Sequence, residues 1–409
     1  MNGEEPGEPL LFEGLKVLDV GTWIAGPVSA TILADFGASV IKVEVPGPGD
    51  PYRALANGPL SPRAPMNYMW LTDARNKRSI TLNLAHPEGR EILMRLVREC
   101  DVYITNQPFA TRRKLRLTYE DLAHENERMV YASLTAYGEE GPDAELEGFD
   151  GVAWWARSGL MDMVRAPGAT PGMSVPGMGD HPTAVSMYAA IITALLRRER
   201  TGKGGKVHTS LLANGVWANA CLASGAVVHA EFPVREVPPP PPRTPNRVLF
   251  PTSDNRLLQL YMVRTHAELD GLLLAAGRDD LLADERFADP ASRLENGPDL
   301  IEELKRTFAG RTAREWLALF REAGVPVTLV AEMGDLPGDP QLRLNNIVVP
   351  PVDPSVPAGL VINHPLNIDG MPRVGPRRAP EVGEHTAEVL AELGFSPDEV
   401  ASLQERGVT

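Results

Sequence analysis

Asp180 is the residue whose type and setting point most directly to chemistry. It lies in the stretch "SVPGMGDHPTAVSMYAA", after a run of small residues and directly before an apolar, helix-like segment. An ionised carboxylate can attack a thioester as a nucleophile, and the neighbouring glycines leave room for a bulky ligand. We expect N–H groups at the start of the helix to keep this carboxylate ionised.

The ordinary role of an aspartate at such a place is to cap the helix. The sequence also offers competing caps. Pro182 favours the first helical position, which would make His181 the cap, and Thr183 is a further candidate. Asp180 would then lie just outside the helix. The residues alone favour a cap over a nucleophile, and both interpretations stay open at this point.

Alternating strands and helices must position this carboxylate. Apolar runs predict strands at 16–20, 39–45, 79–84, 101–106, 129–138 and 207–212. Helical spacing predicts helices at 27–38, 87–100, 118–126 and 181–200. Units of this β-α-β kind form parallel sheets with right-handed crossovers. We therefore expect an α/β protein with a Rossmann-like large domain.

The composition changes near 233–245, where "VREVPPPPPRTP" predicts an extended linker or an active-site flap. A hairpin near 247–263 and three helices at 267–277, 298–310 and 312–324 are predicted beyond it. Little regular structure is expected over 334–380, before a last helix at 383–394. We predict a large domain over 1–225 and a smaller α+β domain over 226–334 that includes the linkers.

Composition and missing motifs argue against several functions. The 409 residues carry a formal charge of −14, whereas nucleic-acid binding needs a basic face. Two cysteines and eight unclustered histidines favour neither a disulfide framework nor a metal site. The first turn, "GTWIAGP", lacks the glycine pattern of a dinucleotide site. No apolar run approaches the roughly 20 residues that span a bilayer, and the acidic start is unlike a signal peptide. We expect a cytoplasmic protein without a membrane or nucleic-acid partner.

Basic residues nevertheless gather in three places in the first half of the chain, at 74–79, 111–116 and 197–206. Each cluster alone is typical of a solvated helix face or a helix C-terminus. Together they suit a small polyanionic ligand.

Stretches spread in order from near residue 11 to near 394 resemble one enzyme family. They include "LFEGLKVLDVGTWIAGPVSATILADFGASVIKVEVPGPGDPYR", "RNKRSITLNL", "YASLTAYGEEGP", "PGMGDHPTAVSMYAAIITALLRRERTGKGGKVHTSLL" and "APEVGEHTAEVLAELG". The chain is identified by them as similar to the family III CoA-transferases. The resemblance implies a Rossmann-like large domain that 335–409 completes, a smaller domain and an interlocked, ring-like homodimer. It also implies transfer of CoA from an acyl-CoA donor to a free carboxylic acid, with CoA as substrate and no permanently bound cofactor.

The resemblance assigns roles to particular residues. Asp180 matches the family's nucleophile, which forms an aspartyl-acyl anhydride and then an aspartyl-CoA thioester. The positions that match the family's CoA contacts are Ile24, Ala25, Arg75, Lys77, Arg78, Asn106, Lys114, Thr135 and Ala136. Val45 stands where many members carry an arginine, which puts one phosphate contact in doubt.

Two other activities stay open. The first is racemisation of an acyl-CoA. Racemases of the family carry a His-Asp pair where this chain has Phe149-Asp150, so this chain would need another base, such as His181. A CoA-binding protein without turnover is the second alternative.

The size of the acid is a further open point. Trp154 or Trp155, with Met161 and Met163, could wall a pocket for an apolar acid. Arg157 could instead pair with the second carboxylate of a dicarboxylic acid. We lean toward the apolar acid.

Overall fold

The computed structural model describes residues 8–59 and 61–409, and the chain separates into two compact units. The larger unit combines Met1–Phe232 with Pro340–Thr409, and the smaller unit is Pro233–Asp339. The chain thus leaves the larger unit once and returns to it. The predicted assignment of CoA binding to the larger unit stays a prediction.

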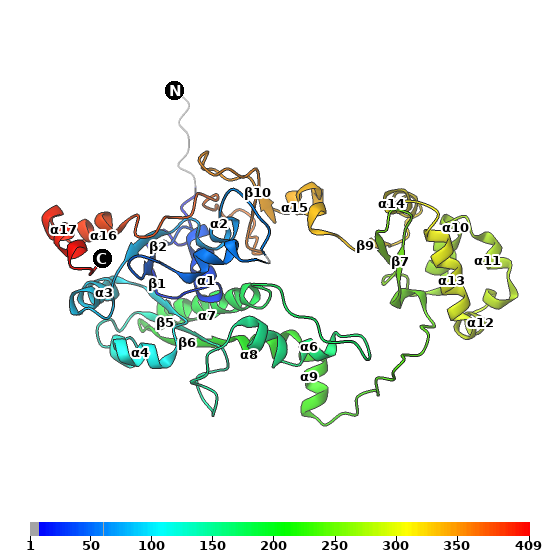
Figure 1. Ribbon diagram of the computed structural model, residues 1–409, viewed down its shortest axis with the longest axis horizontal. Helices are drawn as coiled ribbons and strands as arrows, with labels where there is room; N and C mark the ends of the chain where they lie inside the picture. The colour runs from blue at the N-terminus through cyan, green and yellow to red at the C-terminus, as the bar shows by residue number, and fades with distance from the viewer. Residues whose placement is uncertain (1–7, 60) are drawn as a thin grey trace. The chain divides into compact units, whose positions relative to one another are not determined.

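A six-stranded sheet forms the centre of the larger unit (Figure 1). Its strands are β1 (Lys16–Asp19), β2 (Ser39–Glu44), β3 (Arg78–Thr81), β4 (Val102–Thr105), β5 (Val130–Thr135) and β6 (Gly205–Ser210). They lie in the order β3-β2-β1-β4-β5-β6, and every neighbouring pair is parallel. The α/β class and the parallel sheet that the sequence predicts are confirmed.

Successive side chains on each strand alternate between two apolar cores, one on each face of the sheet. Val17 and Val102 belong to a core that α1 (Ala25–Asp35) and α7 (Asp180–Thr201) complete. Leu18 and Tyr103 belong to the other, completed by α3 (Pro87–Glu99) and two C-terminal helices. Because both faces are covered, the strands read as unbroken apolar runs in the sequence.

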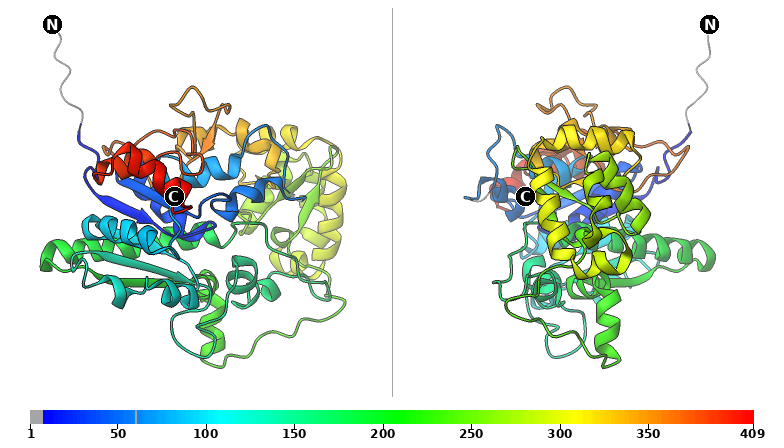
Figure 2. Two further views of the ribbon diagram at one scale, coloured as in Figure 1. Left: turned by 60° about the vertical axis from the view of Figure 1, so that its left-hand side comes forward. Right: turned by 90° about the vertical axis from the view of Figure 1, so that its right-hand side faces the viewer.

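The two C-terminal helices, α16 (Thr386–Glu392) and α17 (Pro397–Glu405), pack beside the N-terminal half of the sheet. Figures 1 and 2 show them in red near α3. Arg78 lies 2.8 Å from Glu388, and the N–H of Asn83 donates to the carbonyl of Val408 at 2.8 Å. The final predicted helix is therefore shorter than expected and is followed by one that the sequence did not indicate.

Several other elements differ from their prediction. The helix expected over 118–126 is the single turn α5 (Tyr119–Leu122), and residues 211–212 begin α8 (Leu211–Ala218) instead of ending a strand. The elements that the sequence did not indicate include α2 (Tyr68–Ala74), α4 (Phe109–Leu115), the π-helical η2 (Gly151–Ala156), α6 (Leu160–Met163) and α9 (Ala220–Val227).

The smaller unit has its own core. A three-stranded antiparallel sheet, β7 (Leu249–Pro251), β8 (Leu257–Gln259) and β9 (Thr328–Leu329), packs with the helices α10 (His266–Ala275), α11 (Asp279–Ala283), α12 (Pro290–Glu295), α13 (Gly297–Phe308) and α14 (Ala313–Glu322). Phe308 contacts the rings of Phe250, Trp316 and Phe320 at the centre. The proline-rich stretch 233–244 forms neither helix nor strand, as its composition predicts.

Candidate active site

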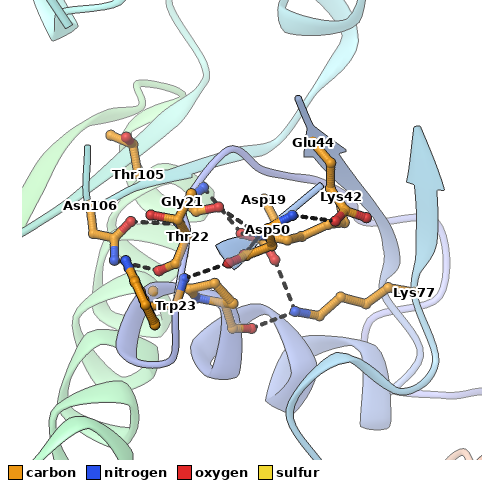
Figure 3. A network of polar contacts seen from close by, with 12 residues as sticks. Asp19, Gly21, Thr22, Trp23, Lys42, Glu44, Asp50, Lys77, Thr105 and Asn106 are labelled. Carbon is orange, nitrogen blue, oxygen red and sulfur yellow. Dashed lines mark hydrogen bonds and ion pairs between the residues drawn. The ribbon is translucent and has the colours of Figure 1, made fainter. Parts of the chain in front are cut away.

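The turn from β1 to α1 is tied to the end of β4. Thr22 and Asn106 exchange two hydrogen bonds: the N–H of Thr22 donates to Oδ1 of Asn106 at 2.8 Å, and Nδ2 of Asn106 donates to the carbonyl of Thr22 at 2.7 Å (Figure 3). β1 and β4 are the neighbours at which the strand order reverses. In open α/β sheets ligands bind outside the carboxyl ends of the strands at such a point.

A buried ionic network holds the same turn (Figure 3). Nζ of Lys42 lies 2.8 Å from Oδ2 of Asp50, whose Oδ1 accepts from the N–H of Trp23 at 3.0 Å. Nζ of Lys77 lies 2.9 Å from Oδ2 of Asp19. Burial alone would lower the pKa of Lys42, but the carboxylates of Asp19 and Asp50 raise it above its ordinary value. Such charges are stable in the interior only when they are paired, so the network fixes the turn.

Asp180 is the first residue of α7, and Gly179 occupies the cap position without a capping side chain. None of the three candidate caps, Asp180, His181 and Thr183, therefore occupies the cap position, and Asp180 lies inside the helix. The hydroxyl of Thr183 instead donates back to the carbonyl of Gly179 at 2.7 Å. A Cβ on Gly179 would lie 2.5 Å from Cγ of Trp154, so this position has no room for a side chain. Close packing places Asp180, and no capping bond holds its carboxylate.

The carboxylate of Asp180 lies among other acids. Burial and the neighbouring charge of Asp150 raise its pKa to about 7, with Asp73 adding to the effect and His181 opposing it. Asp150 is itself fixed, because its Oδ2 accepts from the N–H of Gly179 at 2.9 Å. Burial and the neighbouring acids thus oppose the ionisation that the N–H groups of the helix were expected to favour.

His181 points to two acceptors. Its Nε2 lies 3.1 Å from Oδ1 of Asp73, and its Nδ1 lies 3.0 Å from the carbonyl oxygen of Gly177. The hydroxyl of Tyr52 donates to Oδ2 of the same Asp73. Burial would lower the pKa of His181, but the bond to Asp73 and its charge raise the pKa to about 9.

A cavity of about 170 Å³ opens at Asp180; we call it the Asp180 cavity. It brings together Asp180 and four of the predicted CoA contacts, Ala25, Asn106, Thr135 and Ala136. These residues come from the first turns of α7 and α1 and from the carboxyl ends of β4 and β5. The fold therefore brings the carboxylate of Asp180 and several main-chain loops together at one edge of the sheet.

A second cavity, of about 260 Å³, lies at the carboxyl ends of β1, β2 and β3; we call it the strand-end cavity. It shares Thr22 and Gln107 with the Asp180 cavity. Val45 lines it, as do two residues of α4, the helix that carries the exposed Lys114.

A third cavity, of about 420 Å³, has mainly apolar walls and is called the apolar cavity here. Its apolar side chains include Ile24, Val28, Ile32, Leu55, Met69 and Val185. Ile24 and His181 line the apolar cavity. Their neighbours in the chain, Ala25 and Asp180, line the Asp180 cavity. The turn before α1 and the first turn of α7 therefore form the wall between the two cavities.

Five predicted CoA contacts do not line the Asp180 cavity: Ile24, Lys114 and the three basic residues of the cluster at 74–79. The guanidinium of Arg75 is buried and lies 2.6 Å from Asp35. Lys77 is held by Asp19, as described above, and Arg78 pairs with Glu388 and Glu392. The basic cluster at 74–79 thus supports the fold through internal ion pairs. Its predicted role in binding CoA has no geometric support.

A comparison with known protein families decides the wider grouping. Residues 12–386 match the model of CoA-transferase family III. The chain belongs to this family. It is 29% identical to (R)-2-hydroxy-4-methylpentanoate CoA-transferase of Clostridioides difficile, over 98% of this chain and 99% of that protein. It is 31% identical to cinnamoyl-CoA:phenyllactate CoA-transferase of Clostridium sporogenes, over 97% and 96%.

The fold of the family is shared as well. The crystal structure of a CaiB/BaiF family protein from Brucella suis matches with a TM-score of 0.82 at 29% identity. The match covers 95% of this chain and all of that one.

The tryptophans expected at the substrate do not line the described cavities. Trp154 and Trp155 stack on each other, with ring centroids 6.2 Å apart, in the core beside α7. Arg157 pairs with Asp143 and stacks over Tyr137. Neither the tryptophan pocket nor the dicarboxylate role of Arg157 is supported by this geometry.

Residues that the sequence did not single out complete the site. Tyr52 and Asp73 lie far from residue 181 in the chain, and no local motif marks them. Asp150 was noted only as the partner of Phe149. Across residues 8–59 and 61–409 no group of three or more His, Cys, Asp or Glu could hold a metal ion. In the same described residues no helix is long and apolar enough to cross a membrane.

Proposed function

We propose that this family member transfers CoA between an acyl-CoA and a free carboxylic acid, with Asp180 as the nucleophile. The observation that carries the proposal is the state of Asp180 itself. Its carboxylate lines a cavity on the ligand-binding edge of the sheet and accepts no hydrogen bond from any side chain or main-chain donor among the described residues. A structural cap would be bonded, whereas a nucleophile needs free lone pairs.

The reaction then runs through covalent intermediates on one side chain. Asp180 attacks the thioester carbonyl, expels CoA thiolate and becomes a mixed anhydride. The thiolate attacks the aspartyl carbonyl, releases the donor acid and leaves an aspartyl-CoA thioester. The acceptor carboxylate attacks this thioester and expels the thiolate, which then takes the acceptor acyl group and frees Asp180. Each step exchanges one acyl bond for another, so the route uses CoA as a substrate and needs no prosthetic group.

The two cavities that share Thr22 and Gln107 suit an extended thioester. The nucleotide part of CoA would occupy the strand-end cavity, where open α/β sheets bind nucleotides. The pantetheine arm would pass Thr22 to reach Asp180. Lys114, exposed on α4 beside the strand-end cavity, is placed to meet a phosphate.

The apolar cavity supports an acceptor with a branched or aryl side chain. Its volume and walls suit such a group, and it lies across one wall from Asp180. Two of the relatives are named for 2-hydroxy-4-methylpentanoate and phenyllactate, which are acids of this kind. The preference for an apolar acid inferred from the sequence therefore stands as a proposal, with a different set of wall residues.

We also propose that the protein is a homodimer, as the family resemblance implies. Large apolar side chains are exposed on α8, α9 and the residue after it, with Trp217 79%, Val227 77% and Val228 72% exposed. Patches of this kind mark interfaces. Sedimentation should give one dimeric species that does not dissociate on dilution, and a concentration-dependent monomer would contradict the proposal.

The transfer is tested by mass spectrometry. Purified protein is mixed with several acyl-CoA donors, each with a panel of aliphatic, aryl and dicarboxylic acids. The wild type should form new acyl-CoA masses, and Asp180→Asn should form none while it still binds CoA. Deuterium uptake from heavy water without a new acyl-CoA would indicate racemisation. Near wild-type turnover by Asp180→Asn would show that this residue is not the nucleophile.

A further inference from the structure

His181 has an unusual set of partners for a histidine. A neutral imidazole has one N–H donor and one acceptor nitrogen. Here Nε2 faces a carboxylate of Asp73 and Nδ1 faces the carbonyl oxygen of Gly177, at 3.1 and 3.0 Å. Both partners can only accept, so both ring nitrogens must donate. The ring satisfies this geometry only as the doubly protonated imidazolium.

The surroundings hold the ring in this arrangement. Asp73 is 2% exposed, and its second oxygen accepts from the hydroxyl of Tyr52. Gly177 has a φ of +78°, and a Cβ there would lie 2.8 Å from Nδ1 of His181. A glycine is therefore required at 177 for the carbonyl to meet the ring.

We propose that His181 is a positioning residue for the transfer reaction, a fixed cation that keeps the carboxylate of Asp180 in its nucleophilic, ionised form. The proposal rests on the proposed function of Asp180. It also gives His181 a role other than a base, because neither ring nitrogen has a free lone pair. The racemase alternative, which needed His181 as a base, loses its support by the same geometry.

The other charges around Asp180 raise its pKa and so favour its neutral form. Asp150 at the start of η2 and Asp73 on α2 disfavour a further negative charge, and burial adds to their effect. Tyr52, on the 3₁₀ turn η1 (Pro51–Asn57), stays protonated because burial and the charges of Asp73 and Asp180 raise its pKa. His181 is the group among these that lowers the pKa of Asp180.

The test is the pH profile of transfer for His181→Gln and His181→Arg. Loss of the cation in His181→Gln should raise the apparent pKa of the acidic limb. A rise of one unit from about 7 cuts the ionised fraction at pH 7 about fivefold, yet leaves about nine-tenths ionised at pH 9. The variant should therefore be impaired near pH 7 and recover toward pH 9. His181→Arg should keep the wild-type profile, and the exposed His124→Gln is the control for the substitution itself.

A second measurement is independent of activity. Nitrogen NMR of histidine-labelled protein at pH 8, with His181 assigned by its loss in His181→Gln, should show both ring nitrogens protonated. A neutral tautomer at pH 8, or an equal loss of activity by His181→Gln at pH 7 and pH 9, overturns the proposal. Failure of the wild type to transfer CoA from any donor would instead refute the function proposed for Asp180, and the NMR result would remain valid.

Discussion

Asp150 accepts a hydrogen bond from the N–H of Gly179, the residue that directly precedes the proposed nucleophile. This bond fixes a negative charge beside Asp180 and anchors the start of α7 at the same time. The acidity of Asp180 is therefore set by the packing of two segments that are 30 residues apart. The following changes test that relationship and the elements around it.

Asp150→Asn should move the acidic limb of the transfer profile to lower pH. The amide oxygen can still accept from Gly179, but the charge that raises the pKa of Asp180 is gone. This direction is opposite to that expected for His181→Gln. The apparent pKa of kcat/KM for the two variants and the wild type gives the answer, and a shift of both in one direction would contradict the electrostatic account.

Asp180→Asn should stabilise the folded protein at the expense of activity. The folded-state pKa of about 7 lies above the ordinary value of 3.8, so the folded protein binds more protons than the unfolded chain between these values. The destabilisation by Asp180 is absent below pH 4 and complete above pH 7. Because solvent partly screens the charge, the free energy of unfolding at pH 8 should rise by on the order of 2 kcal/mol in Asp180→Asn. Thermal melts from pH 4 to pH 8, with the exposed Asp369→Asn as control, measure it.

Gly179→Ala should reduce both stability and transfer. The added methyl group would overlap Trp154 and displace either the stacked rings or the first turn of α7, which carries Asp180. Gly172→Ala is the matched control, because a Cβ there has no neighbour within 4 Å among the described atoms. Equal activity of the two variants would show that the contact with Trp154 does not position Asp180.

Lys42→Met should destabilise the larger unit strongly. Its removal leaves Asp50 and Asp19 with less compensation in the interior, at a cost of about 3–5 kcal/mol. Lys16→Met breaks an exposed pair with Glu99 and should cost less than about 1 kcal/mol. Denaturant unfolding of both variants distinguishes the two environments. Similar losses would mean that the buried network is not what holds the turn after β1.

Val185→Trp should change the choice of acid. Val185 lines the apolar cavity one turn after His181, so the larger ring would fill space that a branched or aryl acid needs. The apparent KM should rise at least about tenfold for such acids and much less for acetate. Leu196→Trp, at an exposed position of the same helix, is the control. An equal effect on short and bulky acids would place the acyl group elsewhere.

The sequence predicted the strands and long helices of the molecule better than its candidate active site. Strands such as 39–45 and 101–106 are recognisable because both of their faces are buried, which leaves continuous apolar runs. Short helices such as α2 and α4 have no such pattern, since their positions depend on contacts with distant residues.

The same limit applies to the site residues. Resemblance to the family picked out Asp180, and the fold brought Ala25 and Asn106 to it. The role of Asp73 depends on contact with a residue 108 positions away, and the burial of Lys77 depends on Asp19. Neither pairing can be recognised from neighbouring residues in the sequence. The cluster at 74–79 therefore resembled a ligand site, although Arg75 and Lys77 are buried in ion pairs.

The return of the chain from the smaller unit has a consequence for the order of folding during synthesis. Val389, Leu403 and Val408 complete the core that covers β1 to β4 on one face. The ribosome makes these residues only after the whole of the smaller unit. The smaller unit is continuous and has its own core, so it can fold before the C-terminal helices that complete the core of the larger unit have been made. A nascent chain of this protein therefore exposes an apolar sheet face until residue 408 has been made, and a chain that stalls before this point would be aggregation-prone.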